Sequence, residues 1–369
     1  MTFYDFLQKN NADTVRKKMY HQTISDVDNV LKKETLHMAD FLTLLSPAAE
    51  QRIEEMAIRA HEETIHSFGK TMLLYTPLYV ADYCVNHCTY CSFSIIHDFE
   101  RKKLTFSEID KEAKLIADKG FKHILLLTGE SKLHTPVSYI KEAVFILKQY
   151  FSSIAIEINP LEEKEYKELV DAGVDGLTVY QEVYNETAYK DYHIKGPKRH
   201  FQNRLQAPER GCQAGMRTVT IGALLGLEEW RSEVFFTGAH ANYLQKKYLD
   251  VDINVSFPRL RPHLGGQKPR YDVNDKALVQ SLLALRLFLP HTGITLSTRE
   301  RAKLRSDLIP LGVTKMSADS STIVGEHCRE EEATPQFEIS DKRSVEEIVQ
   351  DLQQKGYQPV FQDWVPLKV

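Results

Sequence analysis

The sequence lacks the features that mark several specialised classes of protein. No stretch approaches the roughly 18 uninterrupted apolar residues of a membrane-spanning helix, and the opening residues, MTFYDFLQKNNADTVRKK, contain no apolar core of a signal peptide. With 47 basic and 51 acidic residues, the formal net charge of −4 gives no basic surplus for nucleic acid or an acidic membrane surface. We therefore expect a globular cytoplasmic protein that binds neither nucleic acid nor membrane.

Cysteine is scarce, with five in 369 residues. Cys212 and Cys328 stand alone and form no disulfide pattern, which favours a reducing compartment. The other three, Cys84, Cys88 and Cys91, fall within the eight residues CVNHCTYC. Three thiols this close together in a reducing compartment are more often metal ligands than small buried hydrophobic side chains.

Short apolar or β-branched runs alternate with longer charged stretches through most of the chain. Because alternating strands and helices with buried strands indicate a parallel sheet, and there are eight runs, we predict an α/β fold, a (β/α)8 TIM-type barrel. Active sites of such barrels lie in the loops after the strands, and CVNHCTYC follows the first of them. The predicted strands are 71–80, 123–129, 154–160, 176–183, 217–226, 252–257, 294–300 and 313–320.

The two ends of the chain have a different pattern from this central region. Residues 1–70 are predicted to form an N-terminal helical extension, in which Ser46 and Pro47 begin a helix. Residues 71–325 form the predicted barrel. Residues 326–369 are predicted to be a short C-terminal extension with one helix, which a capping box of Ser344 and Glu347 begins.

The three-cysteine loop allows two interpretations from its residues. A structural zinc site needs four ligands, and His87 could be the fourth, which would make the protein a zinc-binding interaction module. Alternatively, three thiolates bind a [4Fe-4S] cluster, which ordinarily takes four cysteines, so one iron stays open for a small molecule. The spacing C-x3-C-x2-C, with Tyr90 before the last cysteine, resembles the signature of the radical S-adenosylmethionine (SAM) superfamily.

That resemblance implies that SAM binds the open iron and is held by the ends of the barrel strands. The ends of the second, third and fifth strands carry polar or small residues that fit this role. The structural alternatives are a plain turn in Thr-Gly-Glu, a carboxylate satisfied inside the barrel, and glycines that serve only packing. The implied SAM contacts are Tyr90, Thr128, Gly129, Glu130, Glu157, Asn159, Gly222, Leu225 and Gly226.

Longer stretches resemble one subgroup of the superfamily, the aromatic amino-acid lyases. CVNHCTYCSF, LLLTGE, HIKGPKRHFQNRL and LSTRERAKLRSDLIPLGVTKMSADSST are most similar to the 2-iminoacetate synthases of thiazole and thiamine biosynthesis. The resemblance implies cleavage of the Cα–Cβ bond of L-tyrosine to 2-iminoacetate (dehydroglycine) and 4-methylphenol, with SAM converted to 5′-deoxyadenosine and methionine. Thiazole synthase would accept the imine, and a low-potential flavodoxin or ferredoxin would donate the electron.

Two features bear on which member of the subgroup this chain resembles. The tyrosine lyases of hydrogenase maturation carry a second group of three cysteines near the C-terminus, and this sequence has none there. The substrate is less specified, because a lyase acting on tryptophan or another aromatic amino acid would show the same motifs.

The late strands supply candidate contacts for the substrate. A zwitterionic amino acid needs a cation for its carboxylate and a polar group for its amine. The candidates are Arg299, Ser317, Ser320, Ser256 and Arg259. Arg299 could instead pair with Glu300 or Asp319, and the serines could be ordinary loop hydroxyls. Related lyases read SAGS where this chain reads SADS, so Asp319 could add a negative charge near the pocket.

The partner of the phenol and the cover of the pocket are less defined by the sequence. Tyr180, Gln181, Glu182 and His263 could meet the phenol, although a structural role suits each of them as well. The run KGPKRH at 195–200 could cover the pocket as a lid or remain a solvated loop.

Overall fold

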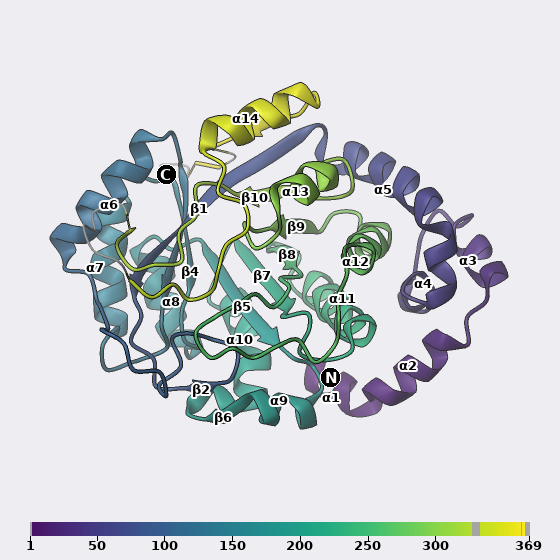
Figure 1. Cartoon of the computed structure of the whole chain (residues 1–369), viewed down its shortest axis with the longest axis horizontal. Helices are drawn as coiled ribbons and strands as arrows, with labels where there is room; N and C mark the ends of the chain where they lie inside the picture. The colour runs from purple at the N-terminus through teal and green to yellow at the C-terminus, as the bar shows by residue number, and fades with distance from the viewer. Residues whose placement is uncertain (1, 327–332, 363, 366–369) are drawn as a thin grey trace.

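The computed structural model, which describes residues 2–326, 333–362 and 364–365, contains a closed barrel of eight parallel strands (Figure 1). The barrel closes between β10 and β1, where Leu73 pairs with Lys315. All eight predicted strands are present, and the predicted fold class is confirmed. The strands are β1 (Thr71–Ala81), β3 (His123–Thr128), β4 (Ser153–Glu157), β5 (Gly176–Glu182), β7 (Thr218–Ala223), β8 (Asp252–Ser256), β9 (Gly293–Leu296) and β10 (Lys315–Ser317).

Helices follow the barrel strands and cover their outer face. Their ends follow local sequence signals: Thr105 and Glu108 form a capping box at the start of α6, and Gly120 and Gly173 adopt positive φ just after α6 and at the end of α8. The helices are α6 (Phe106–Asp118), α7 (Val137–Leu147), α8 (Glu163–Ala172), α9 (Glu186–Tyr192), α10 (Phe201–Gln213), α11 (Trp230–Lys247), α12 (Asp275–Phe288) and α13 (Ala302–Leu308).

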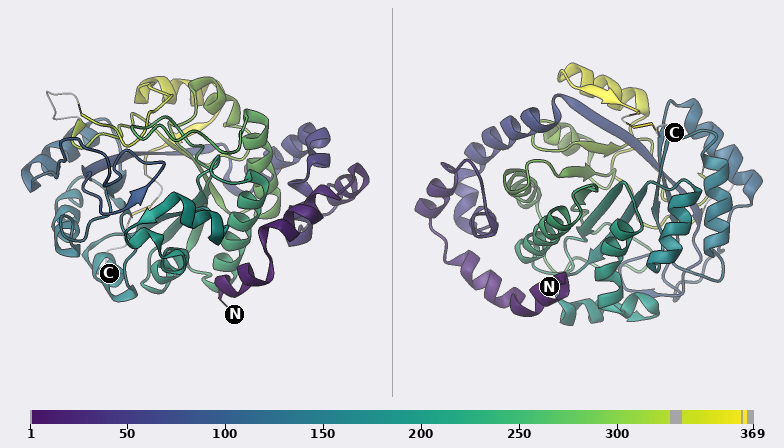
Figure 2. Two further views of the ribbon diagram at one scale, coloured as in Figure 1. Left: turned by 60° about the horizontal axis from the view of Figure 1, so that its bottom comes forward. Right: turned by 180° about the vertical axis from the view of Figure 1, so that it is seen from behind.

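The N-terminal residues form helices that pack outside α10, α11 and α12 (Figure 2). Phe41 stacks on Phe288 of α12, with ring centroids 4.6 Å apart. The predicted start at Ser46 is present, but the first turns form a 3-10 helix that passes into a longer α-helix. The elements are α1 (Phe3–Lys9), α2 (Ala12–Tyr20), α3 (Ile24–Val30), α4 (Met38–Leu44), η1 (Pro47–Arg52) and α5 (Ile53–Phe68).

The C-terminal residues add a helix and a strand to the barrel. α14 (Val345–Gln354) begins at the capping box of Ser344 and Glu347, as predicted. β11 (Gln358–Val360), which the sequence did not indicate, pairs in parallel with the first residues of β1. Leu73 therefore lies between Lys315 on one side and Val360 on the other.

Residues 333–341 cross the end of the barrel at which the strands terminate. The amide of Glu338 donates to the Pro262 carbonyl at 2.9 Å, and that of Ser340 to the Thr298 carbonyl at 2.9 Å. Both acceptors lie in loops that follow barrel strands. The 333–341 segment is thereby held over the face where the sequence predicts the active site. Within the described ranges, no helix combines the length and apolar character required to span a bilayer.

Candidate active site

A cavity of about 140 Å³ lies at the C-terminal ends of the barrel strands. Each of the eight strands, or the loop that follows it, contributes to its lining, and the 333–341 segment adds Gln336 and Phe337. The three clustered cysteines border this cavity. Eight other predicted site residues also line the cavity: Tyr90, Thr128, Gly129, Glu130, Glu157, Arg299, Ser317 and Ser320.

The cysteine loop is anchored to the loop that follows α9. β2 (His87–Cys88) pairs antiparallel with β6 (His193–Lys195), with Cys88 opposite His193. The Tyr90 hydroxyl hydrogen-bonds His193 Nε2 at 2.7 Å, and His193 Nδ1 lies 2.7 Å from the Tyr189 carbonyl. Tyr90 thus anchors the cysteine loop through its hydroxyl group, and the same side chain lines the cavity.

Asn86 and Gly129 hold the loop against the end of β3. The Asn86 side chain donates to Glu130 Oε2 at 2.9 Å and accepts from the Lys198 amide at 2.9 Å. Gly129 donates its amide to the Ala81 carbonyl at 2.7 Å, and a Cβ at Gly129 would overlap the Tyr83 carbonyl oxygen. The glycine of Thr-Gly-Glu is therefore required by the close approach of two backbones.

The three thiols suit iron–sulfur ligation. Burial raises the pKa of Cys84, Cys88 and Cys91, that of Cys91 to about 11, so the thiols are protonated at neutral pH and would lose their protons when iron binds. No three His, Cys, Asp or Glu side chains of the described residues converge as ligands of one metal ion do. Thiolates of a four-iron cluster each bind a different iron and need not converge, so these residues fit a cluster.

Two acids and two bases form what we call the cavity network: Glu130, Glu182, Lys198 and Arg204. Arg204 lies 2.8 Å from Glu130 and 3.6 Å from Glu182, while Lys198 lies 3.7 and 2.9 Å from the same two carboxylates. Burial opposes ionisation of Glu130, but Arg204 and Lys198 outweigh it and hold its pKa below the ordinary value. The network gives the wall beside the cysteines fixed, balanced charges.

The sequence indicated only half of this network. The sequence predicts Glu130 as a SAM contact, Glu182 as a possible phenol partner and Lys198 only as part of the KGPKRH run that could cover the pocket, and it predicts no role for Arg204. Lys198 lies in the KGPKRH run, in the short 3-10 helix η2 (Pro197–Arg199), and Arg204 in the first turns of α10. The basic composition of HIKGPKRHFQNR, which directly follows the β5 unit, was the available signal.

Glu157 lies at the end of β4 and faces the same cavity. Burial, reinforced by the nearby negative charge of Glu182, raises its pKa to about 7. Within the described residues, the Glu157 carboxylate makes no ion pair or hydrogen bond. Glu157 therefore holds its proton more tightly than an ordinary carboxyl group does.

Arg299 is the cation on the opposite wall. Its guanidinium stacks on Phe337, 3.4 Å from the ring centroid, and the described residues provide it with no ion pair. Both partners considered from the sequence are engaged elsewhere: Glu300 pairs with Arg259, and Asp319 pairs with Lys119. Among the described residues, the Arg299 guanidinium therefore lines the cavity without a hydrogen-bonded carboxylate partner.

Hydroxyl groups near Arg299 complete this wall. Ser317 Oγ accepts from the Thr298 amide at 3.1 Å. The hydroxyls of Ser320 and of Thr128, across the cavity, are buried and have no hydrogen-bond partner among the residues that the structure describes. Because a buried polar group without a partner costs stability, these hydroxyls are suited to a ligand or water in the cavity.

The remaining predicted residues lie near the strand ends but do not border the cavity. Arg259 also pairs with Asp275 at 3.0 Å. A Cβ at Gly222 would overlap the Ser256 carbonyl oxygen, so this pair is in backbone contact. Gly226 has φ of 111° in a turn. The predicted residues absent from the lining are Asn159, Ser256, Arg259, Gly222, Leu225 and Gly226.

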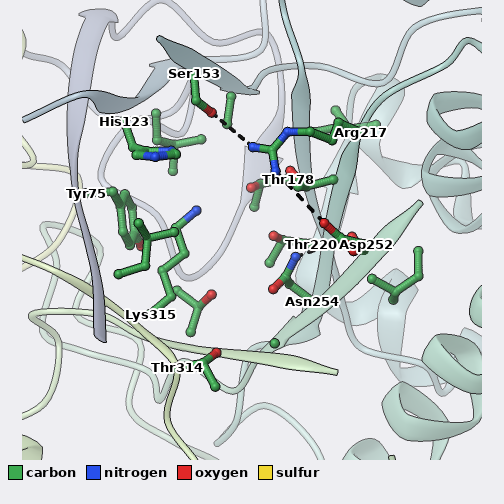
Figure 3. Close-up of a pocket in the computed structure, with 18 of the residues that line it drawn as sticks. Tyr75, His123, Ser153, Thr178, Arg217, Thr220, Asp252, Asn254, Thr314 and Lys315 are labelled. Carbon is green, nitrogen blue, oxygen red and sulfur yellow. Dashed lines mark hydrogen bonds and ion pairs between the residues drawn. The ribbon is translucent and has the colours of Figure 1, made fainter. Parts of the chain in front are cut away.

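A second cavity, of about 370 Å³, occupies the opposite end of the barrel (Figure 3). Its walls carry hydroxyls and charged groups, where Arg217 lies 3.3 Å from Ser153 Oγ and 3.9 Å from Asp252. Tyr75, Leu125 and Tyr180 border both cavities. No cysteine lines it, so the chemistry of the thiols is confined to the first cavity.

Comparison with known proteins places the site in a family. Residues 78–249 match the family model described as the radical SAM superfamily, and residues 256–358 match that of the biotin and thiamin synthesis associated domain. The chain is 38% identical to the 2-iminoacetate synthase of Escherichia coli K12, over 98% of this chain and 97% of that protein. The Salmonella typhimurium 2-iminoacetate synthase is equally similar, with the same coverage.

Solved structures give the same picture. A crystal structure of HydG, a maturase of the [FeFe]-hydrogenase, superposes with a TM-score of 0.92 at 30% identity, covering 97% of this chain and 81% of that one. The structure of methylornithine synthase superposes with a TM-score of 0.74 at 21% identity, covering 91% and 97% of the two chains, and supports the fold.

Proposed function

The chain belongs to the 2-iminoacetate synthase family of radical SAM enzymes, and we propose that it cleaves the Cα–Cβ bond of L-tyrosine. The products are 2-iminoacetate and 4-methylphenol. The observation that supports this most directly is the shared cavity, which is lined both by the three cysteines and by Arg299, a cation without an ion pair among the described residues. A bound [4Fe-4S] cluster and SAM supply the one-electron chemistry that removes a hydrogen atom from the substrate, giving 5′-deoxyadenosine and methionine.

Three groups of residues divide the work on the cofactors. Cys84, Cys88 and Cys91 hold the cluster and leave one iron open for SAM. The cavity network beside them offers both signs of charge and would bind the amino and carboxylate groups of SAM, with Glu130 as the partner of the ammonium. Glu157, at the end of the next strand, would accept hydrogen bonds from the SAM ribose hydroxyls. Strand-end loops around the cavity exclude water from the reacting atoms.

Arg299 and two serines bind the amino-acid end of the substrate. The guanidinium is held flat on Phe337, which presents its donors to a carboxylate in a fixed plane. Ser317 and Ser320 offer hydroxyls to the substrate amine on the same wall. Replacing Arg299 with methionine should therefore raise the KM for tyrosine much more than the Kd for SAM.

The wider setting of the enzyme follows from its product. We infer that thiazole synthase accepts the imine, that a low-potential flavodoxin or ferredoxin donates the electron, and that the enzyme works in the cytoplasm. We also propose the three-part division of the chain into residues 1–70, 71–325 and 326–369. The imine hydrolyses to glyoxylate in water, which gives a stable readout in the absence of the acceptor.

The test is an anaerobic incubation of the reconstituted protein with SAM, tyrosine and dithionite, followed by mass spectrometry. We expect 4-methylphenol, glyoxylate and 5′-deoxyadenosine. Tryptophan in place of tyrosine should give no 3-methylindole; its appearance, with tyrosine inert, would assign the chain to the tryptophan-directed alternative. Protein that contains one zinc and no iron or sulfide would instead support the zinc-binding module.

Two cysteine variants sharpen this test. Cys88→Ala should lose iron, sulfide and all three products, because it removes a ligand at the centre of the motif. Cys212→Ala is the matched control: Cys212 is equally buried, but it lies on α10 and does not line the cavity. Retained turnover in Cys88→Ala would exclude the cluster assignment.

A further inference from the structure

A side chain from the 333–341 segment reaches one of the three cluster cysteines. Gln336 Nε2 donates to Cys91 Sγ, with the two atoms 3.7 Å apart. The Phe93 amide also donates to this sulfur, and the donors to Cys84 are the backbone amides of Asn86 and Glu130. The other donors to these sulfurs are backbone amides. Among the described residues, Gln336 therefore provides a side-chain donor that a substitution can remove without altering the cysteine loop.

The orientation of the Gln336 amide is fixed by its surroundings. The Tyr79 hydroxyl donates to Gln336 Oε1 at 2.8 Å, which leaves the NH₂ group directed at the sulfur. The reverse orientation would place a carbonyl oxygen against a thiolate, two negative groups in contact. The amide is thus preorganised by a partner from β1, whose own ring borders the cavity.

The backbone of Gln336 is anchored on both sides. Its amide donates to the Thr322 carbonyl at 3.0 Å, and its carbonyl accepts from the Ser92 amide at 3.3 Å. The next residue is fixed as well, because the Thr322 hydroxyl donates to the Phe337 carbonyl at 2.8 Å. A side chain anchored in this way keeps its dipole pointed at Cys91 whichever charge the cluster carries.

We propose that Gln336 is a positioning residue that raises the reduction potential of the cluster, with Tyr79 holding its amide in place. The inference rests on the proposed cluster. On reduction, one electron passes from the external reductant to the cluster, and no bond of the protein forms or breaks. The added negative charge spreads onto the cysteine sulfurs, and an N–H directed at one of them stabilises the reduced state more than the oxidised state.

The test is a spectroscopic redox titration of the anaerobically reconstituted enzyme without SAM. Gln336→Leu should shift the midpoint potential to a more negative value, because the hydrogen bond is lost. Gln336→Glu should shift it further in the same direction, because a carboxylate beside Cys91 opposes the added electron. Tyr79→Phe should give a smaller negative shift, because the donor remains but is no longer fixed.

Gln353→Leu is the matched control. Gln353 is exposed on α14, so the same substitution should leave the potential unchanged. Unchanged potentials in both Gln336 variants at full iron content would overturn the proposal. If Gln336→Leu does not retain iron, Tyr79→Phe decides in its place, and an unchanged potential there overturns the proposal equally. Wild-type protein without iron would instead contradict the proposed function, so the two failures are distinct.

Discussion

The chain contains two networks of ion pairs, and their surroundings differ. The cavity network has two acids and two bases beside the cysteines. A second network joins α13 to the end of the 333–341 segment and to α14; its acids are Asp341 and Asp351, and its bases are Arg305, Arg343 and Lys355. Its members line neither of the two cavities, whereas all four of the first network line the cysteine cavity.

The difference shows what separates a structural charge from a functional one. Asp341 and Arg305 have no exposed side-chain surface, and Arg305 also donates to the Ser317 carbonyl. The charged groups of Arg305 and Asp341 are therefore bound by other protein groups and are not available to a ligand. The members of the cavity network are also paired with one another, but all four of them line the cysteine cavity. Burial and pairing alone do not indicate function; unfilled space beside the pair does.

Breaking the second network should have the largest effect, and the effect should be on stability. Asp341→Leu leaves the buried Arg305 guanidinium without its carboxylate, which typically costs about 3–5 kcal/mol. Chemical denaturation measures this loss. Asp307→Leu on the same helix as Arg305 is the control, because its pair with Lys303 at 2.8 Å is exposed and worth less than about 0.5 kcal/mol. Equal losses in the two variants would refute the contrast.

Breaking the cavity network should affect SAM chemistry before it affects folding. Arg204→Met leaves Glu130 and Glu182 with one shared ammonium, and we expect 5′-deoxyadenosine formation to fall by roughly 100-fold, about 2.7 kcal/mol of barrier. Arg210→Met is the control on the same helix, since Arg210 donates instead to the Leu161 carbonyl and to Asn203. Circular dichroism checks folding. If Arg204→Met cleaved SAM at the full wild-type rate, the cavity network would have no role in SAM chemistry, and the contrast with the second network would be wrong.

The stability of the protein should also depend on pH through Glu157, which lines the same cavity as the cavity network but has no partner among the described residues. Its pKa is raised from 4.5 to about 7, so folding favours the protonated acid. The contribution to stability is present below about pH 4.5 and is lost as pH rises to about 7. Solvent in the cavity limits the loss to about 1–2 kcal/mol.

The comparison of wild type with Glu157→Gln isolates this contribution, because every other titrating group is shared. Wild-type stability should fall relative to that of the variant between pH 5 and pH 8, as measured by urea denaturation. Parallel curves over that range would show that Glu157 carries no such shift.

Asp319 should give the smallest effect. It adopts φ of 49°, a conformation that costs a non-glycine residue about 1 kcal/mol, and its carboxylate pairs with the half-exposed Lys119. Asp319→Gly should therefore raise stability by at most about 1 kcal/mol, whereas Lys119→Met, which removes the pair alone, should change it by less. A destabilised glycine variant would show that the ion pair outweighs the backbone strain.

The sequence predicted the local features and missed those that depend on contacts between residues far apart in the chain. The eight strands, the capping boxes and the cysteine loop follow from short-range patterns. The cavity network joins residues 74 positions apart, as in Glu130 and Arg204, and no local pattern signals such a contact. β11 is three residues long and obtains its partners from β1, far earlier in the chain. The sequence raised the possibility that Asp319 adds a negative charge near the pocket, but Asp319 does not line the cavity and pairs with Lys119 of another βα unit.

The pairing of β1 constrains the order in which the enzyme can mature. This strand leads directly into the cysteine loop and is synthesised early, yet its neighbours at Leu73 are residues 315 and 360. The strand that leads into the iron ligands thus lacks its neighbours until residues 315 and 360 have been synthesised. We therefore expect chains truncated after Gly356 to take up less iron than the chain that contains β11.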